Sequence, residues 1–114
     1  MKHKSRSAKG RYLQNIVKQK IFKLYPSLTK KDIRTSMNGE NSADIKLLTS
    51  TAKKLFPYSV ECKNRNESKG IYKHYKQATG HSPREPLLVI KMNREKPLAI
   101  IDLDHLFSLL EKSD

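Results

Sequence analysis

Glu61 and Lys63 set a carboxylate and an amine two residues apart in segment 57–63, which reads as a β-strand. Successive side chains of a strand point to opposite faces, so Ser59, Glu61 and Lys63 are expected to share one face. The other face is apolar and is expected to pack inward; its members are Tyr58, Val60 and Cys62. The pattern therefore predicts one face for chemistry and one for packing.

A second carboxylate, Asp44, lies upstream, with enough chain between it and Glu61 for a turn onto a neighbouring strand. Two carboxylates and Lys63 at one place are the groups that metal-assisted phosphodiester hydrolysis requires. The carboxylates offer hard oxygen ligands to Mg²⁺, and the ammonium can orient water or stabilise the transition state. The alternative is an ordinary Glu61–Lys63 ion pair on a half-exposed strand, with Asp44 as a strand-edge charge.

Composition indicates a small, strongly basic protein. The 114 residues fit one domain and carry a net charge of +13, which favours a polyanionic partner such as nucleic acid, with anionic membrane as the rival. No apolar stretch is long enough to span a bilayer or to act as a signal peptide, so a soluble cytoplasmic protein is expected. A single cysteine excludes an intrachain disulfide and disfavours a zinc cluster, so Cys62 is interpreted as a buried apolar residue.

The amino-terminal part is basic throughout. Residues 1–10 lack apolar periodicity and read as a mobile arm, whereas 11–24 carry apolar residues at helical spacing up to Pro26. Arm and helix are either a solvated surface or a phosphate-binding track. The candidate DNA-binding residues are Lys4, Arg6, Lys9, Arg11, Gln14 and Lys18.

Two strands and a short helix are expected next. Segment 32–37 reads as a strand, and Asn38-Gly39 favours a tight hairpin turn to a second strand that contains Asp44. One or two helical turns at 49–56 then end at Pro57, where the strand with Glu61 begins.

The carboxyl-terminal half predicts a helix over 70–79 and two buried strands over 86–92 and 98–103, joined by a turn. Asp104 is expected to cap a final helix. Its apolar stripe is interpreted as core or as a subunit contact, and consists of Leu106, Phe107 and Leu110.

Asp44 followed by Glu61-Cys62-Lys63, and a later helix with Gln77, resembles the PD-(D/E)XK nuclease superfamily. The resemblance implies an α/β (α+β) fold with a restriction-endonuclease-like αβββαβ core, a central mixed sheet flanked by helices, over a single nuclease domain, 11–114. Within the superfamily the chain is most similar to small Holliday-junction resolvases and related phage endonucleases, in which a Lys-Gly-Arg start, here residues 9–11, opens the first helix.

Carried onto this sequence, the resemblance implies that Asp44 and Glu61 bind Mg²⁺ or Mn²⁺ and that the Cys62 carbonyl adds a ligand. Lys63 would be the catalytic lysine, and Gln77 would support the site.

The sequence departs from the family pattern at two positions. Ala43 stands where the family has proline, and Gln14 stands where resolvases often have a glutamate in the first helix. Glu40 is either a compensating metal ligand or a turn residue. The histidines show no metal-binding spacing, although His74 is a candidate to face the site.

These features predict a metal-dependent endodeoxyribonuclease for branched DNA such as Holliday junctions, acting as a homodimer because two symmetric strands need two active sites. The resemblance also suggests a phage-encoded enzyme in the host cytoplasm. The alternatives are a sequence-specific, homing or nicking endonuclease of the same fold, and a nucleic-acid-binding module whose acids are structural.

Overall fold

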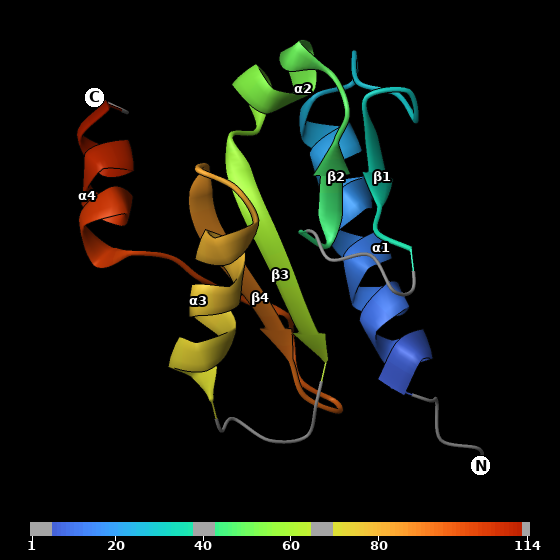
Figure 1. Cartoon of the computed structure of the whole chain (residues 1–114), viewed down its shortest axis with the longest axis vertical. Helices are drawn as coiled ribbons and strands as arrows, with labels where there is room; N and C mark the ends of the chain where they lie inside the picture. Colours follow the sequence, from blue (N-terminus) through green and yellow to red (C-terminus); the bar gives the residue numbers. More distant parts are fainter. Residues whose placement is uncertain (1–5, 38–42, 65–69, 113–114) are drawn as a thin grey trace.

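The computed structural model describes residues 6–37, 43–64 and 70–112 (Figure 1). No helix in these three ranges is both long and apolar enough to cross a bilayer. The elements in chain order are α1 (Arg6–Leu24), β1 (Ile33–Thr35), β2 (Ile45–Leu47), α2 (Ser50–Leu55), β3 (Tyr58–Asn64), α3 (Ile71–His81), β4 (Glu85–Lys91), β5 (Leu98–Ile100) and α4 (Leu103–Lys112).

The described strands form two sheets in an α+β fold. In the mixed sheet β3 runs parallel to β4, and β4 runs antiparallel to β5, while β1 and β2 form a separate antiparallel pair. The expected mixed sheet flanked by helices is confirmed for β3, β4 and β5, whereas β1 and β2 form a sheet of their own. The two sheets meet at Asp44, whose N–H donates to the Val60 carbonyl over 2.9 Å.

Strand β3 lies between α1 and α3, as the alternation of its side chains predicts. Val60 and Cys62 belong to the apolar cluster that includes Leu13 and Val17 of α1. On the opposite face, the Ser59 hydroxyl donates to the Ala78 carbonyl of α3 over 2.8 Å. Helices thus cover both faces of β3, so Ser59 and Glu61 are buried as well as Val60 and Cys62.

Helix α1 begins earlier than the sequence pattern indicates. Residues 6–10, assigned above to a mobile arm, are helical, so the expected start of the helix at residue 11 is wrong. The helix buries Leu13, Val17 and Ile21 against the sheets, while Leu24 at its end is 66% exposed. The early start follows from a tertiary contact, because the Asn64 amide donates to the Lys9 carbonyl over 2.9 Å.

The β1–β2 pair confirms a hairpin but not the expected tight turn. A two-residue turn at 38–39 would place Thr35 opposite residue 42, whereas the structure pairs it with Ile45. The turn residues themselves lie outside the described ranges. The observed register puts Asp44 between the sheets, since the Ser36 N–H donates to its carbonyl over 2.9 Å.

Helix α2 is confirmed, and Thr49 is its N-cap. The Thr49 hydroxyl accepts a hydrogen bond from the Ala52 N–H over 3.2 Å and donates to a carboxylate oxygen of Asp32 over 2.7 Å. A capping side chain thereby fastens α2 to the start of β1.

The last two elements differ from the sequence expectation. Strand β5 has three residues and is exposed, with Leu98 60% exposed, so the expectation of a second buried strand over 98–103 is wrong. No strand of the described residues pairs with its outer edge. The cap of α4 is Asp102, which accepts from the His105 N–H over 2.9 Å, and not Asp104. Figure 1 shows α4 set apart at the side of the molecule away from α1.

Candidate metal and nucleic-acid site

Asp44 is held against the edge of β3 that faces away from β4, by its backbone and by its side chain. Its N–H donates to the Val60 carbonyl, and one of its carboxylate oxygens, Oδ2, accepts from the Cys62 N–H over 2.6 Å. This short, charge-assisted bond fixes the carboxylate one residue from Glu61. The hairpin register therefore brings together the two acids that the sequence separates.

Glu61 and Lys63 form an ion pair in which Glu61 is buried and Lys63 is partly buried. Lys63 Nζ lies 3.6 Å from Glu61 Oε1, and the two side chains are 20% and 9% exposed. The alternative interpretation is a pair on a half-exposed strand, where such contacts contribute little. The structure instead buries Glu61 and partly buries Lys63 on the face of β3 that α3 covers, where charge interactions are stronger and desolvation is costly.

Glu61 has an elevated affinity for a proton. Burial is the main cause and the nearby Asp44 carboxylate the second, and together they raise the pKa of Glu61 to about 7 against the opposing effect of the Lys63 ammonium. Burial likewise raises the pKa of the Cys62 thiol well above its ordinary value, which is consistent with a structural role for this residue. The acid pair is thus a place where excess negative charge is poorly tolerated.

The oxygens around Asp44 suit a hard divalent cation. Both backbone groups of a strand residue point to the same edge, so the Cys62 carbonyl faces the edge on which Asp44 lies. Mg²⁺ is commonly held by one or two carboxylates with water and substrate phosphate completing its shell. Two carboxylates and one carbonyl fit that set. Among residues 6–37, 43–64 and 70–112, no three His, Cys, Asp or Glu side chains form a metal-binding group.

The structure does not bring Gln77 to the acid pair. Its side chain is exposed on α3, and its Oε1 lies 3.3 Å from Nδ1 of His74, one turn away on the same helix. Among the described residues, Gln77 therefore has no contact with the acid pair that would give it the expected supporting role. His74, the other candidate to face the site, contacts Gln77 on the surface of the same helix. Glu40, the other candidate ligand, lies outside the described ranges.

The predicted DNA-binding residues are only partly described. Lys4 lies outside the described ranges, and of Arg6 only the backbone is placed. Lys9 Nζ donates to the Asn93 side chain over 3.3 Å. The remaining candidates are exposed or half-buried along α1 and comprise Arg11, Gln14 and Lys18.

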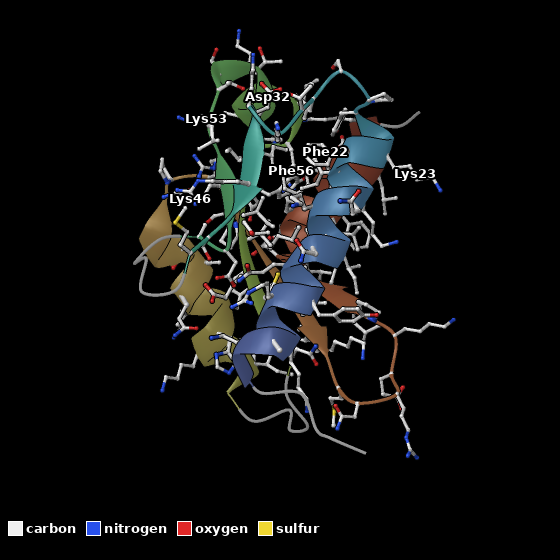
Figure 2. All side chains as sticks on the ribbon, turned by 90° about the vertical axis from the view of Figure 1, so that its right-hand side faces the viewer. Phe22, Lys23, Asp32, Lys46, Lys53 and Phe56 are labelled. Carbon is white, nitrogen blue, oxygen red and sulfur yellow. The ribbon has the colours of Figure 1, made fainter. Side chains whose placement is uncertain are left out.

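Positive charge is not confined to α1. Figure 2 shows Lys23 of α1 and Lys53 of α2 extending from opposite sides of the molecule, with Lys46 of β2 on the side of Lys53. Lys46, two residues after Asp44 in the chain, is also the cross-strand partner of Arg34 of β1. Sequence reasoning overlooked this second basic surface, because the pairing of two cations across neighbouring strands becomes visible only with the strand register.

Asn64 is a further residue that sequence reasoning missed. It is 8% exposed at the end of β3 and holds the first turns of α1 through the Lys9 carbonyl. The available signal was a polar residue at position 64, which follows Val60 and Cys62 on the apolar face of the strand.

Searches with the whole chain matched no family model, no curated protein and no solved structure.

Proposed function

We propose that this protein is a metal-dependent endodeoxyribonuclease centred on Asp44, Glu61 and Lys63. The observation that carries the proposal is the placement of the half-buried Asp44 carboxylate beside the buried Glu61, with the Lys63 ammonium 3.6 Å from Glu61. Two adjacent carboxylates cannot both ionise cheaply unless a cation lies near them. Lysine supplies one positive charge, and a divalent cation would supply the rest.

In this proposal Asp44, Glu61 and the Cys62 carbonyl would hold Mg²⁺ or Mn²⁺. The bound metal would polarise the scissile phosphate and lower the pKa of a water molecule. Lys63 donates hydrogen bonds to the charge that develops on the phosphate oxygens, or orients the attacking water. Asp44 and Glu61 would thus bind the metal, and Lys63 would stabilise the charge on the phosphate oxygens or orient the attacking water.

The order of elements supports a PD-(D/E)XK-like core. The elements α1, β1, β2, β3, α3 and β4 follow one another as the αβββαβ pattern requires, with α2 inserted before β3. The net charge of +13 supports DNA as the polyanion, and we infer cytoplasmic action on branched DNA by a homodimer.

The test is cleavage of labelled four-way junctions, forks and linear duplexes in Mg²⁺. Asp44→Asn and Lys63→Ala are each expected to lower the rate by about 10²–10³-fold. Their matched controls are Asp104→Asn and Lys112→Ala, both on α4, which are exposed and should retain wild-type rates. Equal activity of all five proteins would contradict the proposal. Equal cleavage of every substrate would instead favour a sequence-specific, homing or nicking enzyme.

A non-catalytic nucleic-acid-binding module is the second candidate. It is favoured by the pKa of Glu61 near 7, because a proton shared with Asp44 can satisfy the acid pair without a metal. This candidate predicts steeply salt-dependent DNA affinity with no turnover at any Mg²⁺ or Mn²⁺ concentration. Titration of both metals against binding and cleavage distinguishes the two functions.

A further inference from the structure

One face of α4 exposes a row of large apolar side chains. Leu103, Phe107 and Leu110 are 67%, 61% and 54% exposed, and the helix buries none of its residues. Their spacing of four and three residues places them on one side of the helix, together with Leu106. These four residues are called the α4 stripe. A contiguous apolar face of this kind commonly marks a site of protein association.

The opposite side of α4 attaches it to its own chain. His105 Nε2 lies 2.8 Å from the Tyr58 hydroxyl, and His105 Nδ1 lies 3.6 Å from Glu85 Oε1. His105 is almost half a turn around the helix from the α4 stripe. The helix is therefore held at the start of β3 and β4 with its stripe directed away from that attachment.

A groove of complementary character lies elsewhere on the same chain. It runs between α1 and the strands β4 and β5, with a volume of about 260 Å³. A cavity of ~150 Å³ is large enough to hold a benzene ring, so this groove can take an aromatic ring and an aliphatic side chain. Figure 2 shows Phe56, one of its lining residues, beside α1. Other residues that line this α1–β5 groove are Ile16, Lys20, Leu24, Leu87 and Leu98.

The helix and the groove also carry opposite charge. Residues 102–114 hold four of the 11 acidic residues and one of the 24 basic residues, so this end has a net charge of −3 in a chain of +13. Helix α1, which forms one wall of the groove, contains six basic residues and no acidic residue. Attraction of the two surfaces would offset the repulsion between two copies of a basic protein.

We propose that two copies of this chain associate by placing the α4 stripe of each copy in the α1–β5 groove of the other. A second copy fits because one chain presents both surfaces, matched in polarity and in charge, while its own α4 is held at Tyr58. Reciprocal exchange of two such contacts closes into a dimer. The inference does not depend on the proposed nuclease activity.

Sedimentation velocity over a concentration series, without DNA or metal, tests the proposal. The wild type is expected to form a concentration-dependent dimer. Phe107→Glu in the stripe and Leu98→Glu in the groove should each raise the dissociation constant by more than about tenfold, because each buries an unpaired charge. The control is Tyr72→Glu, which alters a residue on α3 that is 82% exposed and should leave the dimer intact. Far-UV circular dichroism checks that every variant folds.

Mixing the two monomeric variants provides the sharper measurement. A Phe107→Glu copy keeps an intact groove, and a Leu98→Glu copy keeps an intact stripe, so an equal mixture should form a heterodimer through one native contact. A wild type that remains monomeric overturns the inference. So does a Leu98→Glu variant that dimerises as the wild type does while Phe107→Glu does not, because that result means that two stripes pack on each other.

Discussion

Strand β3 and helix α4 both depart from the usual rule that charged side chains are exposed and apolar ones are buried. In β3 a charged side chain is buried, and in α4 apolar side chains are exposed. Glu61, a charged residue, is 7% exposed, whereas Phe107, an aromatic one, is 61% exposed. Buried charges require partners, and contiguous apolar surfaces are seldom left in water. Each region is therefore costly for the isolated chain. Under the two proposals above, the regions would therefore bind different partners, a divalent cation at β3 and an apolar groove at α4.

The regions also differ in how their residues are brought together. Asp44 reaches the Cys62 N–H only through the register of the β1–β2 pair, so the acid pair depends on long-range contacts. The α4 stripe depends only on the periodicity of one helix. Mutations that disturb packing should therefore damage the β3 site more than the α4 stripe.

Substitution in the core should show the largest difference. Leu88→Ala in β4, where the side chain is fully buried, is expected to lower the free energy of unfolding by about 2–5 kcal/mol. Leu98→Ala in the neighbouring β5 should change it by no more than about 0.5 kcal/mol. Urea unfolding measures both, in a Phe107→Glu background so that association does not contribute. Similar losses for the two variants would break the comparison.

Removal of the Asp44 carboxylate should have the next largest effect. Asp44→Ala leaves the Cys62 N–H without its acceptor, at an expected cost of about 1–3 kcal/mol in the free energy of unfolding. Hydrogen exchange of the Cys62 amide should accelerate accordingly. Asp104→Ala, on the exposed face of α4, is the control and should be nearly neutral. A protected Cys62 amide in Asp44→Ala would contradict the assigned contact.

The pKa of Glu61 predicts a dependence of stability on pH. Because the pKa is raised from 4.5 to about 7 in the folded protein, the native state binds the proton more tightly than the unfolded state. The free energy of unfolding should therefore fall as pH rises from 4.5 to about 7 and then level off. Glu61→Gln should remove this component, whereas Glu111→Gln on α4 should retain it.

Addition of Mg²⁺ sharpens the same measurement. A cation between Asp44 and Glu61 favours the ionised carboxylates, so under the nuclease proposal it should shift the transition to lower pH. An unchanged profile in Mg²⁺ would favour the binding-module candidate.

The attachment of α4 should give the smallest effect. Tyr58→Phe removes the hydroxyl that lies 2.8 Å from His105, at an expected cost of about 0.5–1.5 kcal/mol. Hydrogen exchange should accelerate in α4 and remain unchanged in β3. Tyr72→Phe, at an exposed position, is the matched control. Acceleration spread evenly over both elements would mean that α4 and the β3 edge form one cooperative unit.

Sequence periodicity predicted the elements better than it predicted their burial. The helix 70–79 and the strand around Glu61 agree within two residues with α3 and β3, because spacing of apolar side chains is a local property. The prediction that the apolar run 98–103 is a buried strand was wrong, because a continuous apolar segment does not reveal which neighbouring segments cover it. Of the four side chains expected at the candidate site, Asp44, Glu61 and Lys63 lie close together in the structure, whereas Gln77 is exposed on α3.

By itself, the sequence determined the alternation of β3, the helical stripes and the net charge of +13, since each depends on residue type and short-range spacing. Only the tertiary structure decided that Asp44 meets the Cys62 N–H, that Glu61 is buried and that β5 stays exposed. These outcomes arise from strand register and from the cover that distant segments provide. A register shift of one residue reverses every side chain of a strand, so no local pattern can specify them.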